Sequence, residues 1–181
     1  MCTSIFVSAT DKSYLLGRTM DWYDLYVSPI FVPRNYQWQS IYNHRPYQNK
    51  YAVVGTGFQD QNLIDLSDGI NEWGLSVQKL TFANGTSLTT EKNDANIQLA
   101  AFEFVLYTLG NFKSIADLEK QLPTIQLMAL KSQLKHGGDE LHFAVSDASG
   151  RSIVIEPSHS PLKVIENPLG VVTNMPSFEK Q

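Results

Sequence analysis

The sequence predicts an α+β fold in which antiparallel β-sheet carries helices on a face. Two observations lead to this prediction. Strand-like segments occupy both ends of the chain with helical segments between them, and the strand-like segments are joined by short turns. Strands joined by short turns pair antiparallel, whereas parallel strands need long crossover connections. A repeated β-α-β arrangement is therefore not expected.

The predicted strands are short runs rich in β-branched and apolar residues, bounded by turn residues. They are residues 3–9, 14–20, 29–33, 51–55, 74–82, 141–146, 151–156, 163–165 and 170–173. Asp65 and Asp68 lie in a segment rich in Ser, Asp and Gly between two of these runs. We expect that segment to be a turn and both carboxylates to be solvated.

Two segments in the middle of the chain have helical features. Residues 95–109 are too many for a strand, and apolar residues recur there at helical spacing. Asn93 or Asp94 is the expected N-cap, and Gly110 is expected just past the end. A second helix is expected to begin at Ser114, which opens a Ser-x-x-Asp pattern related to the capping box, and to end at Pro123.

Length, charge and motif content exclude several classes of function. The 181 residues predict a single domain, residues 1–181. The 14 Lys and Arg against 18 Asp and Glu give a formal net charge of −4 without a basic run, so no nucleic-acid partner is expected. No membrane span of roughly 18–20 apolar residues and no secretion signal are found, which predicts a cytoplasmic protein. No dinucleotide-binding or metal-binding motif is found, so no cofactor is expected.

The only cysteine is Cys2, directly after the initiator methionine. A single cysteine excludes an internal disulfide and a cysteine zinc cluster. Initiator methionine is removed when the next side chain is small, so we expect the mature chain to begin at Cys2. Such a residue carries a nucleophilic thiol and an α-amine that titrates closer to neutral pH than lysine, so it supplies nucleophile and general base together. The alternative interpretation is a small buried apolar residue near a strand start.

The first two predicted strands form a hairpin whose turn centres on Asp11 and Lys12. That turn pairs residues whose numbers sum to 23, which places Cys2 opposite Asp21 with Cβ atoms about 4.5–5.5 Å apart. The Asp21 carboxylate would then hold the ammonium group, and Arg18 would favour the thiolate. Arg18 is expected on the other face from Asp21, and a slip of one residue would move Asp21 to the opposite face.

Six sequence blocks distributed along the chain match one known family in order and with similar spacing. The blocks are Met1-Cys-Thr-Ser4, Gly17-Arg-Thr-Met-Asp21, Phe31-Val-Pro-Arg34, Tyr51-Ala-Val-Val-Gly55, Asp68-Gly-Ile-Asn-Glu-Trp-Gly-Leu75 and Thr173-Asn-Met-Pro-Ser-Phe178. They resemble the choloylglycine hydrolases, which comprise bile salt hydrolases and penicillin V acylases of the N-terminal-nucleophile superfamily. The resemblance covers about the N-terminal half of a family domain, so residues 1–181 are expected to be the N-terminal part of a longer domain.

This resemblance implies a four-layer αββα sandwich of antiparallel sheets, incomplete in a chain of this length. It implies cleavage of a linear, non-peptide amide with an apolar acyl group through a thioester acyl-enzyme, and a homotetramer. By position, Cys2 would be nucleophile and base, and Asp21 would orient its amine. Arg18 would tune the thiol, and Asn174 would donate a hydrogen bond to the oxyanion.

Two departures from the family pattern affect the expected activity. After Leu80, bile salt hydrolases carry Asn and penicillin V acylases usually Tyr, whereas this chain has Thr81. The missing Asn favours a penicillin V acylase-like or general N-acyl amide hydrolase, with bile salt hydrolase as the alternative. The family's downstream active-site Arg is also absent, so we expect the 181-residue chain alone to be poorly active. A catalytically inactive truncated remnant is the alternative of another class.

Two further features allow more than one interpretation. His142 could form a papain-like dyad with Cys2, but a half-exposed strand histidine is the favoured interpretation. The aromatic cluster after Asp21, formed by Met20, Trp22, Tyr23 and Tyr26, fits a core cluster and an acyl-binding pocket equally well.

Overall fold

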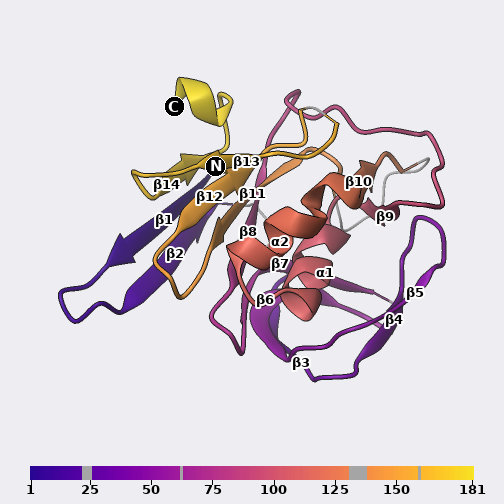
Figure 1. The fold of residues 1–181 in the computed structure, drawn as a ribbon, viewed down its shortest axis with the longest axis horizontal. Coiled ribbons are helices and arrows are strands. Elements are labelled where there is room, and N and C mark those ends of the chain that lie inside the picture. Colours follow the sequence, from indigo (N-terminus) through magenta and orange to yellow (C-terminus); the bar gives the residue numbers. More distant parts are fainter. Residues whose placement is uncertain (22–25, 62, 131–137, 159) are drawn as a thin grey trace.

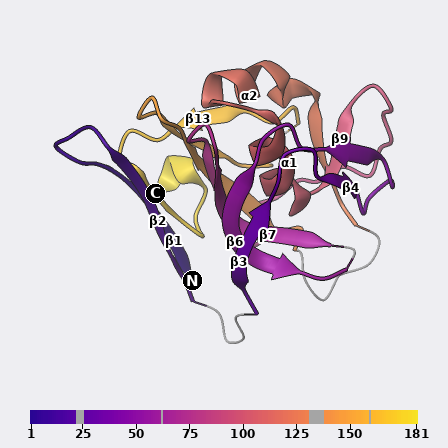
Figure 2. The same ribbon diagram turned by 90° about the horizontal axis from the view of Figure 1, so that it is seen from below.

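The computed structural model of the chain describes residues 1–21, 26–61, 63–130, 138–158 and 160–181. A three-stranded sheet faces a seven-stranded sheet, and two α-helices cover the outer face of the larger sheet (Figures 1 and 2). This arrangement confirms the predicted α+β fold with antiparallel sheets and helices on a face. Among the described residues, no α-helix covers the outer face of the three-stranded sheet, so three of the four expected layers are present.

The larger sheet is antiparallel throughout. In spatial order its strands are β13 (Val164–Glu166), β12 (Ser152–Ile155), β11 (Leu141–Ser146), β8 (Ser76–Thr81), β7 (Ile64–Asn71), β6 (Val53–Gln59) and β3 (Ser28–Val32). The prediction of a solvated turn around Asp65 and Asp68 is wrong, because this segment is the inner strand β7. Asp65 is buried there and forms an ion pair with Lys79 of the neighbouring strand, which compensates the burial of its charge.

The smaller sheet has β1 (Cys2–Ser8) in the middle, between β2 (Tyr14–Met20) and β14 (Val171–Thr173). The predicted hairpin register is wrong by one residue, since Cys2 is paired with Met20 and not with Asp21. The turn has three residues instead of two: the Lys12 amide donates to the Ala9 carbonyl, and Lys12 has a φ of 66°. A type I turn followed by one left-handed residue is the usual geometry of such a loop.

The predicted helix over residues 95–109 begins too early. Its first part is β9 (Ile97–Ala100), which pairs in parallel with β10 (Ile125–Met128), and the helix α1 runs over Glu103–Asn111. Neither Asn93 nor Asp94 caps the helix, and Gly110 lies inside it. The buried residues of β9 fit the spacing of a helix and also that of a buried strand. Pairing with β10 decides that this part is a strand.

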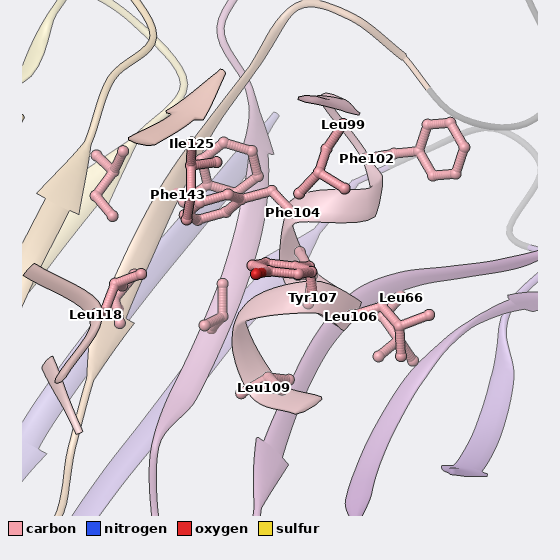
Figure 3. Close-up of a cluster of buried hydrophobic side chains, with 14 of the residues drawn as sticks. Leu66, Leu99, Phe102, Phe104, Leu106, Tyr107, Leu109, Leu118, Ile125 and Phe143 are labelled. Atoms are coloured by element: carbon pink, nitrogen blue, oxygen red, sulfur yellow. The ribbon is translucent and has the colours of Figure 1, made fainter. Parts of the chain in front are cut away.

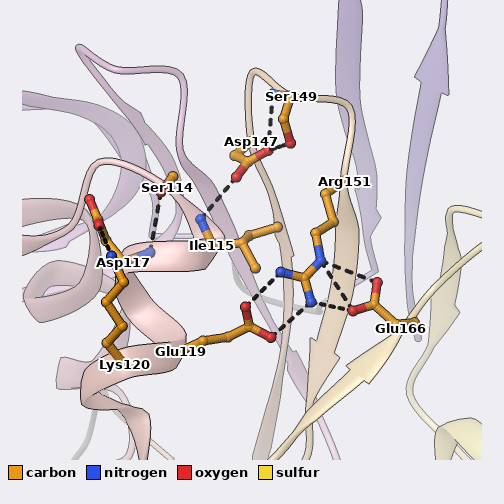
Figure 4. Close-up of polar contacts among 9 residues, drawn as sticks. All are labelled: Ser114, Ile115, Asp117, Glu119, Lys120, Asp147, Ser149, Arg151 and Glu166. Atoms are coloured by element: carbon orange, nitrogen blue, oxygen red, sulfur yellow. Dashed lines mark hydrogen bonds and ion pairs between the residues drawn. The ribbon is translucent and has the colours of Figure 1, made fainter.

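The second helix agrees with its predicted signals. Helix α2 runs over Ile115–Gln121, and the Ser114 hydroxyl accepts a hydrogen bond of 3.2 Å from the Asp117 amide as the N-cap (Figure 4). The 3₁₀ turn η1 (Leu122–Thr124), which contains Pro123, follows it. A second 3₁₀ turn, η2 (Phe178–Lys180), follows β14, and a small hairpin of β4 (Gln37–Gln39) and β5 (Pro46–Gln48) was not predicted.

Helix α2 is tied to the sheet by charged and polar contacts. Arg151, just before β12, makes a bidentate ion pair with Glu119 of α2 at 2.7 and 2.8 Å, and it also contacts Glu166 of β13 (Figure 4). These carboxylates raise the pKa of Arg151 further above its ordinary value. At the start of the helix, the Asp147 carboxylate accepts from the amide of Ile115 at 2.9 Å. The helix is therefore fixed at both ends.

The main hydrophobic core lies between the helices and the seven-stranded sheet (Figure 3). The rings of Phe104 from α1 and Phe143 from β11 are 4.5 Å apart at its centre. Leu118 of α2 and Leu66 of β7 are fully buried around them. A second, smaller apolar cluster lies on the opposite face of the sheet and includes Cys2.

The buried carboxylate of Glu103 fixes the start of α1. It accepts hydrogen bonds from the Ile41 amide at 2.6 Å, from the Ser40 hydroxyl at 2.8 Å and from the Ala100 amide at 2.9 Å. Burial raises the pKa of Glu103 above the ordinary carboxyl value. A raised pKa means that the native state binds the proton more tightly than the unfolded chain. The free energy of unfolding therefore falls as pH rises through the raised pKa.

We predict that Glu103→Gln lowers the free energy of unfolding by about 1–3 kcal/mol at neutral pH. The NH₂ group of the new glutamine would face at least one of the three donors and cannot accept its hydrogen bond. Urea unfolding measures this change, and the part of the pH dependence due to Glu103 should vanish with the substitution. The exposed Glu91, substituted in the same way, is the control. Equal stability of wild type and Glu103→Gln would show that these three hydrogen bonds do not stabilise the fold.

Candidate active site

Cys2 lies at the start of β1 on the face that looks toward the seven-stranded sheet. Its side chain is 5% exposed and packs with Leu80, Ala144, Val154 and Val172. Alternate residues of a strand share a face, so Cys2 and Ser4 point inward together. The thiol is buried among apolar groups, as the apolar interpretation of Cys2 expects, but the contacts of its backbone nitrogen are polar.

Asn174 is the polar contact of Cys2. Thr3 pairs with Thr173, and one further step along this antiparallel register places Asn174 opposite Cys2. The amide of Cys2 donates to Oδ1 of Asn174, and Nδ2 of Asn174 donates to the carbonyl of Thr81 at 2.7 Å. A single half-buried side chain therefore links the start of β1, the end of β14 and the end of β8.

Arg18 lies on the same inner face of the three-stranded sheet as Cys2. The observed register pairs Arg18 with Ser4, two residues along β1 from Cys2. The one-residue change in register therefore brings Arg18, and not Asp21, onto the face of the thiol. The Arg18 side chain is 9% exposed, and its Nη1 donates to the carbonyls of Ser67 at 3.0 Å and Lys79 at 2.9 Å. Arg18 thereby connects the two sheets.

Asp68 is part of this arrangement, although the sequence predicted a solvated residue. Its Oδ2 is 3.8 Å from Nη1 of Arg18, and its Oδ1 accepts from the Thr56 hydroxyl at 2.7 Å. The Thr56 amide donates to the same oxygen at 3.3 Å. The residue types gave no local signal for this role, because the segment has the composition of a turn and its partner Arg18 is far away in the sequence.

Asp21 lies next to Met1. Its Oδ2 is 3.7 Å from the terminal nitrogen of Met1, its amide donates to the Met1 carbonyl at 3.0 Å, and its side chain is 71% exposed. The two residues thus extend the β1–β2 pairing by one step. The Asp21 carboxylate therefore lies beside Met1, whose removal would free the amine of Cys2. The nitrogen of Cys2 itself contacts Asn174 and not Asp21.

Thr81 and His142 differ from their predicted roles. Thr81 contributes its carbonyl to Asn174, a contact that does not depend on the side chain in which the sequence departs from the family. His142 is fully buried on β11 and not half-exposed, because it stacks on the ring of Phe82 and its Nδ1 lies 3.5 Å from Glu156. Of the aromatic cluster after Asp21, Trp22 and Tyr23 lie outside the described residues.

A cavity of about 740 Å³ lies between the two sheets on the side of Arg18 that leads to the hairpin tip. Phe6, Tyr14 and Leu16 line it from β1 and β2, and residues of β6, β7 and β8 line it from the large sheet. On this side β1 and β2 diverge from the larger sheet (Figure 2). Arg18 lines this cavity and Cys2 does not.

Neither a metal-binding cluster nor a membrane-spanning helix is found among the described residues. Over those residues, no group of three His, Cys, Asp or Glu side chains has the arrangement needed to hold a metal ion. Over the same ranges, no helix combines the length and apolar character needed to cross a membrane.

Two solved structures with the same architecture are a conjugated bile acid hydrolase and a penicillin V acylase. The C2A mutant of the conjugated bile acid hydrolase from Clostridium perfringens matches with a TM-score of 0.90 and 31% identity, covering 99% of this chain and 55% of that one. The penicillin V acylase from Agrobacterium tumefaciens matches with a TM-score of 0.75 at 23% identity, which shows the fold alone, over 99% of this chain and 54% of that one. The predicted fold of an N-terminal-nucleophile hydrolase is thereby confirmed.

The sequence model of the linear amide C–N hydrolases of the choloylglycine hydrolase family matches residues 2–181, and the chain belongs to this family. The "Bile salt hydrolase/transferase" of Clostridium perfringens (strain 13 / Type A) is 32% identical over 180 residues, 99% of this chain and 55% of that protein. The "Penicillin V acylase" of Pectobacterium atrosepticum is 26% identical, over 99% of this chain and 50% of that protein. The chain thus spans about half the length of these curated relatives.

We predict that Arg18→Met lowers the free energy of unfolding by about 1–3 kcal/mol, since it removes the donor to the carbonyls of Ser67 and Lys79 and the ion-pair partner of Asp68. Methionine keeps the unbranched side chain, so the loss reports the guanidinium and not the packing. Urea unfolding checks this value.

Arg34→Met is the matched control, because Arg34 forms its ion pair with Glu72 at an exposed position. It should change stability less, since exposed ion pairs contribute little. If both substitutions had the same effect, Arg18 would not hold the two sheets together.

Proposed function

We propose that this chain carries the catalytic nucleophile of an N-terminal-nucleophile hydrolase that cleaves a linear amide. Removal of Met1 makes Cys2 the first residue. The Cys2 thiol attacks the amide carbonyl carbon while its proton passes to the α-amine. The amine of the substrate then leaves with that proton, and a thioester remains on Sγ. Water cleaves the thioester, which releases the acid and restores the thiol.

The observation that carries this proposal is the contact between the nitrogen of Cys2 and Oδ1 of Asn174. In the mature chain this nitrogen is the α-amine, and an acceptor at that place fixes its orientation relative to the thiol of the same residue. A base must be within hydrogen-bond reach of the proton that it takes. The contact therefore supports an amine that is held for proton transfer.

Two other side chains are assigned roles in the same reaction. One N–H of Asn174 Nδ2 donates to Thr81, which leaves its second N–H for the oxyanion. Arg18, on the inner face with Cys2, supplies a positive charge that favours the thiolate. The expectation that Asp21 steadies the amine after Met1 is removed stays a prediction, because this carboxylate contacts Met1.

For the substrate we propose a conjugated bile acid, in which a large apolar acyl group is joined to an amine. The penicillin V acylase-like preference drawn from Thr81 is the less supported one. The relatives at 31–32% identity are named bile salt hydrolases, whereas the penicillin V acylase is 26% identical. The side chain of Thr81 is also not what Asn174 contacts, which weakens Thr81 as a marker of the subfamily.

The remaining expectations about the whole protein stay proposals. These are a homotetramer, a cytoplasmic location and a single small-molecule partner. The exposed outer face of the three-stranded sheet, with Ile5, Val7 and Val171 each more than 40% exposed, supports our expectation that the 181-residue chain alone turns over slowly.

The substrate assay uses a glycine-conjugated bile acid and penicillin V, with release of glycine or of phenoxyacetate as the signal. We predict measurable hydrolysis of the bile acid amide and none by Cys2→Ser, in which a weaker nucleophile replaces the thiolate. Faster hydrolysis of penicillin V would reverse the substrate assignment. No hydrolysis of either amide would favour the inactive remnant for this chain.

We further predict that Asn174→Ala lowers kcat by about 10²–10³, because both the orientation of the amine and an oxyanion donor are lost. Steady-state kinetics on the preferred amide measure this. The exposed Asn93, substituted by Ala, is the matched control and should leave kcat unchanged. A kcat for Asn174→Ala within a factor of two of wild type would remove Asn174 from the mechanism.

A further inference from the structure

The segment that carries Asn174 is fixed from its other side by a buried carboxylate. Four residues after Asn174, the amide of Phe178 donates to Oε1 of Glu156 at 2.7 Å. Glu156 directly follows β12 and is 7% exposed. The ring of Phe178 packs against the apolar cluster that includes Cys2. Glu156 therefore holds residues 174–178 against the large sheet close to the thiol.

His142 lies beside this carboxylate. Nδ1 of His142 lies 3.5 Å from the same Oε1 of Glu156. The imidazole is fully buried and stacks on Phe82 with ring centroids 4.7 Å apart and an angle of 2° between the planes. Phe82 directly follows Thr81, whose carbonyl holds Asn174. The His142–Glu156 pair thus contacts the segment that follows Asn174, through Phe178, and the residue that follows Thr81, Phe82.

The pair is a poor arrangement if stability alone is considered. Nε2 of His142 is buried and has no hydrogen-bond partner among the described residues. A buried polar pair with an unpaired nitrogen is often less stabilising than apolar side chains of the same volume. The His142–Glu156 pair is therefore better explained by a role in positioning the neighbouring segment than by a role in packing.

We propose that Glu156, oriented by His142, is a positioning residue that places Asn174 against the nitrogen of Cys2. This inference rests on the proposed function for its effect on catalysis, but its structural part does not. What matters is the reach of the Glu156 side chain to the Phe178 amide. The charge opposite His142 is secondary, because the interaction that fixes the segment is a hydrogen bond to a backbone amide.

Two conservative substitutions separate reach from charge. Glu156→Gln keeps the length and an acceptor oxygen but loses the charge, whereas Glu156→Asp keeps the charge but is shorter by one methylene. Glu166→Asp is the matched control, because Glu166 is a strand glutamate whose ion pair with Arg151 is largely exposed. All three variants retain a polar side chain, so each is expected to fold.

The first readout is hydrogen exchange, measured by NMR on the full 181-residue chain, at the Phe178 amide and the Asn174 side-chain amide. We expect Glu156→Asp to speed exchange at both groups by about tenfold or more while core amides such as Val154 are unchanged, and Glu156→Gln to stay within about threefold of wild type. If exchange rises equally at all core amides, the role is structural only. If Gln disturbs these groups more than Asp, the charge pair is what matters, and the proposal is overturned.

The second readout is turnover of the preferred amide. We expect Glu156→Asp to lower kcat by about tenfold with KM changed less than threefold, and to have no further effect in the Asn174→Ala background, because residues that act through one group are not additive. Additive losses would overturn the proposal. A wild-type chain without turnover would defeat the proposed function alone, since the exchange pattern then still tests the placement of Asn174.

Discussion

The pairing of β1 with strands on both of its sides is the constraint on which the candidate site depends. A strand at the very start of a chain usually frays, but β1 lies between β2 and β14. Its first residue is therefore held in a defined place, with Cys2 turned toward the large sheet and its nitrogen against Asn174. A reactive group at the tip of a polypeptide gains a fixed geometry only through such pairing.

The two sheets are then held together at this place by polar groups as well as by the small apolar cluster. Arg18 reaches from β2 to carbonyls of β7 and β8, and Asn174 reaches from the end of β14 to the end of β8. The His142–Glu156 pair fixes the segment after Asn174. The hydrogen bonds of Arg18 and Asn174 across the sheets are of the kind that holds side chains in a single arrangement.

The sequence was sufficient for features that have local causes. Capping predicts the start of α2 at Ser114, and proline geometry predicts its end before Pro123. Short β-branched runs predict most of the strands. The hairpin register was missed because Lys12 adopts the left-handed region without the glycine that usually marks it. Strand β7 was missed because its segment has the composition of a turn, although it pairs with its neighbours β6 and β8. The start of α1 was missed because the pairing of β9 with the distant β10, and not local propensity, decides it.

For the candidate site, position and residue type alone were enough to single out Cys2, Arg18 and Asp21, whereas Asn174 was singled out only through the resemblance to the family. The contacts among them were not predictable, because Asn174 and Cys2 come from opposite ends of the sequence. Asp68 and Glu156 carried no signal at all, since an aspartate in a Ser/Asp/Gly segment and a glutamate after a strand are normally solvated. Only the packing of the two sheets shows that they are not.

The proposed mechanism requires that the free amine of Cys2 activates the thiol of the same residue. The most direct measurement is the rate at which an activated ester of an apolar acid acylates Cys2, followed by intact mass after a denaturing quench. Chain without Met1 is compared with chain that retains Met1, prepared by inhibiting methionine removal during expression. We expect acylation at least about tenfold faster in the chain that begins at Cys2. Equal rates in the two forms would contradict it, because the base would then not be the amine.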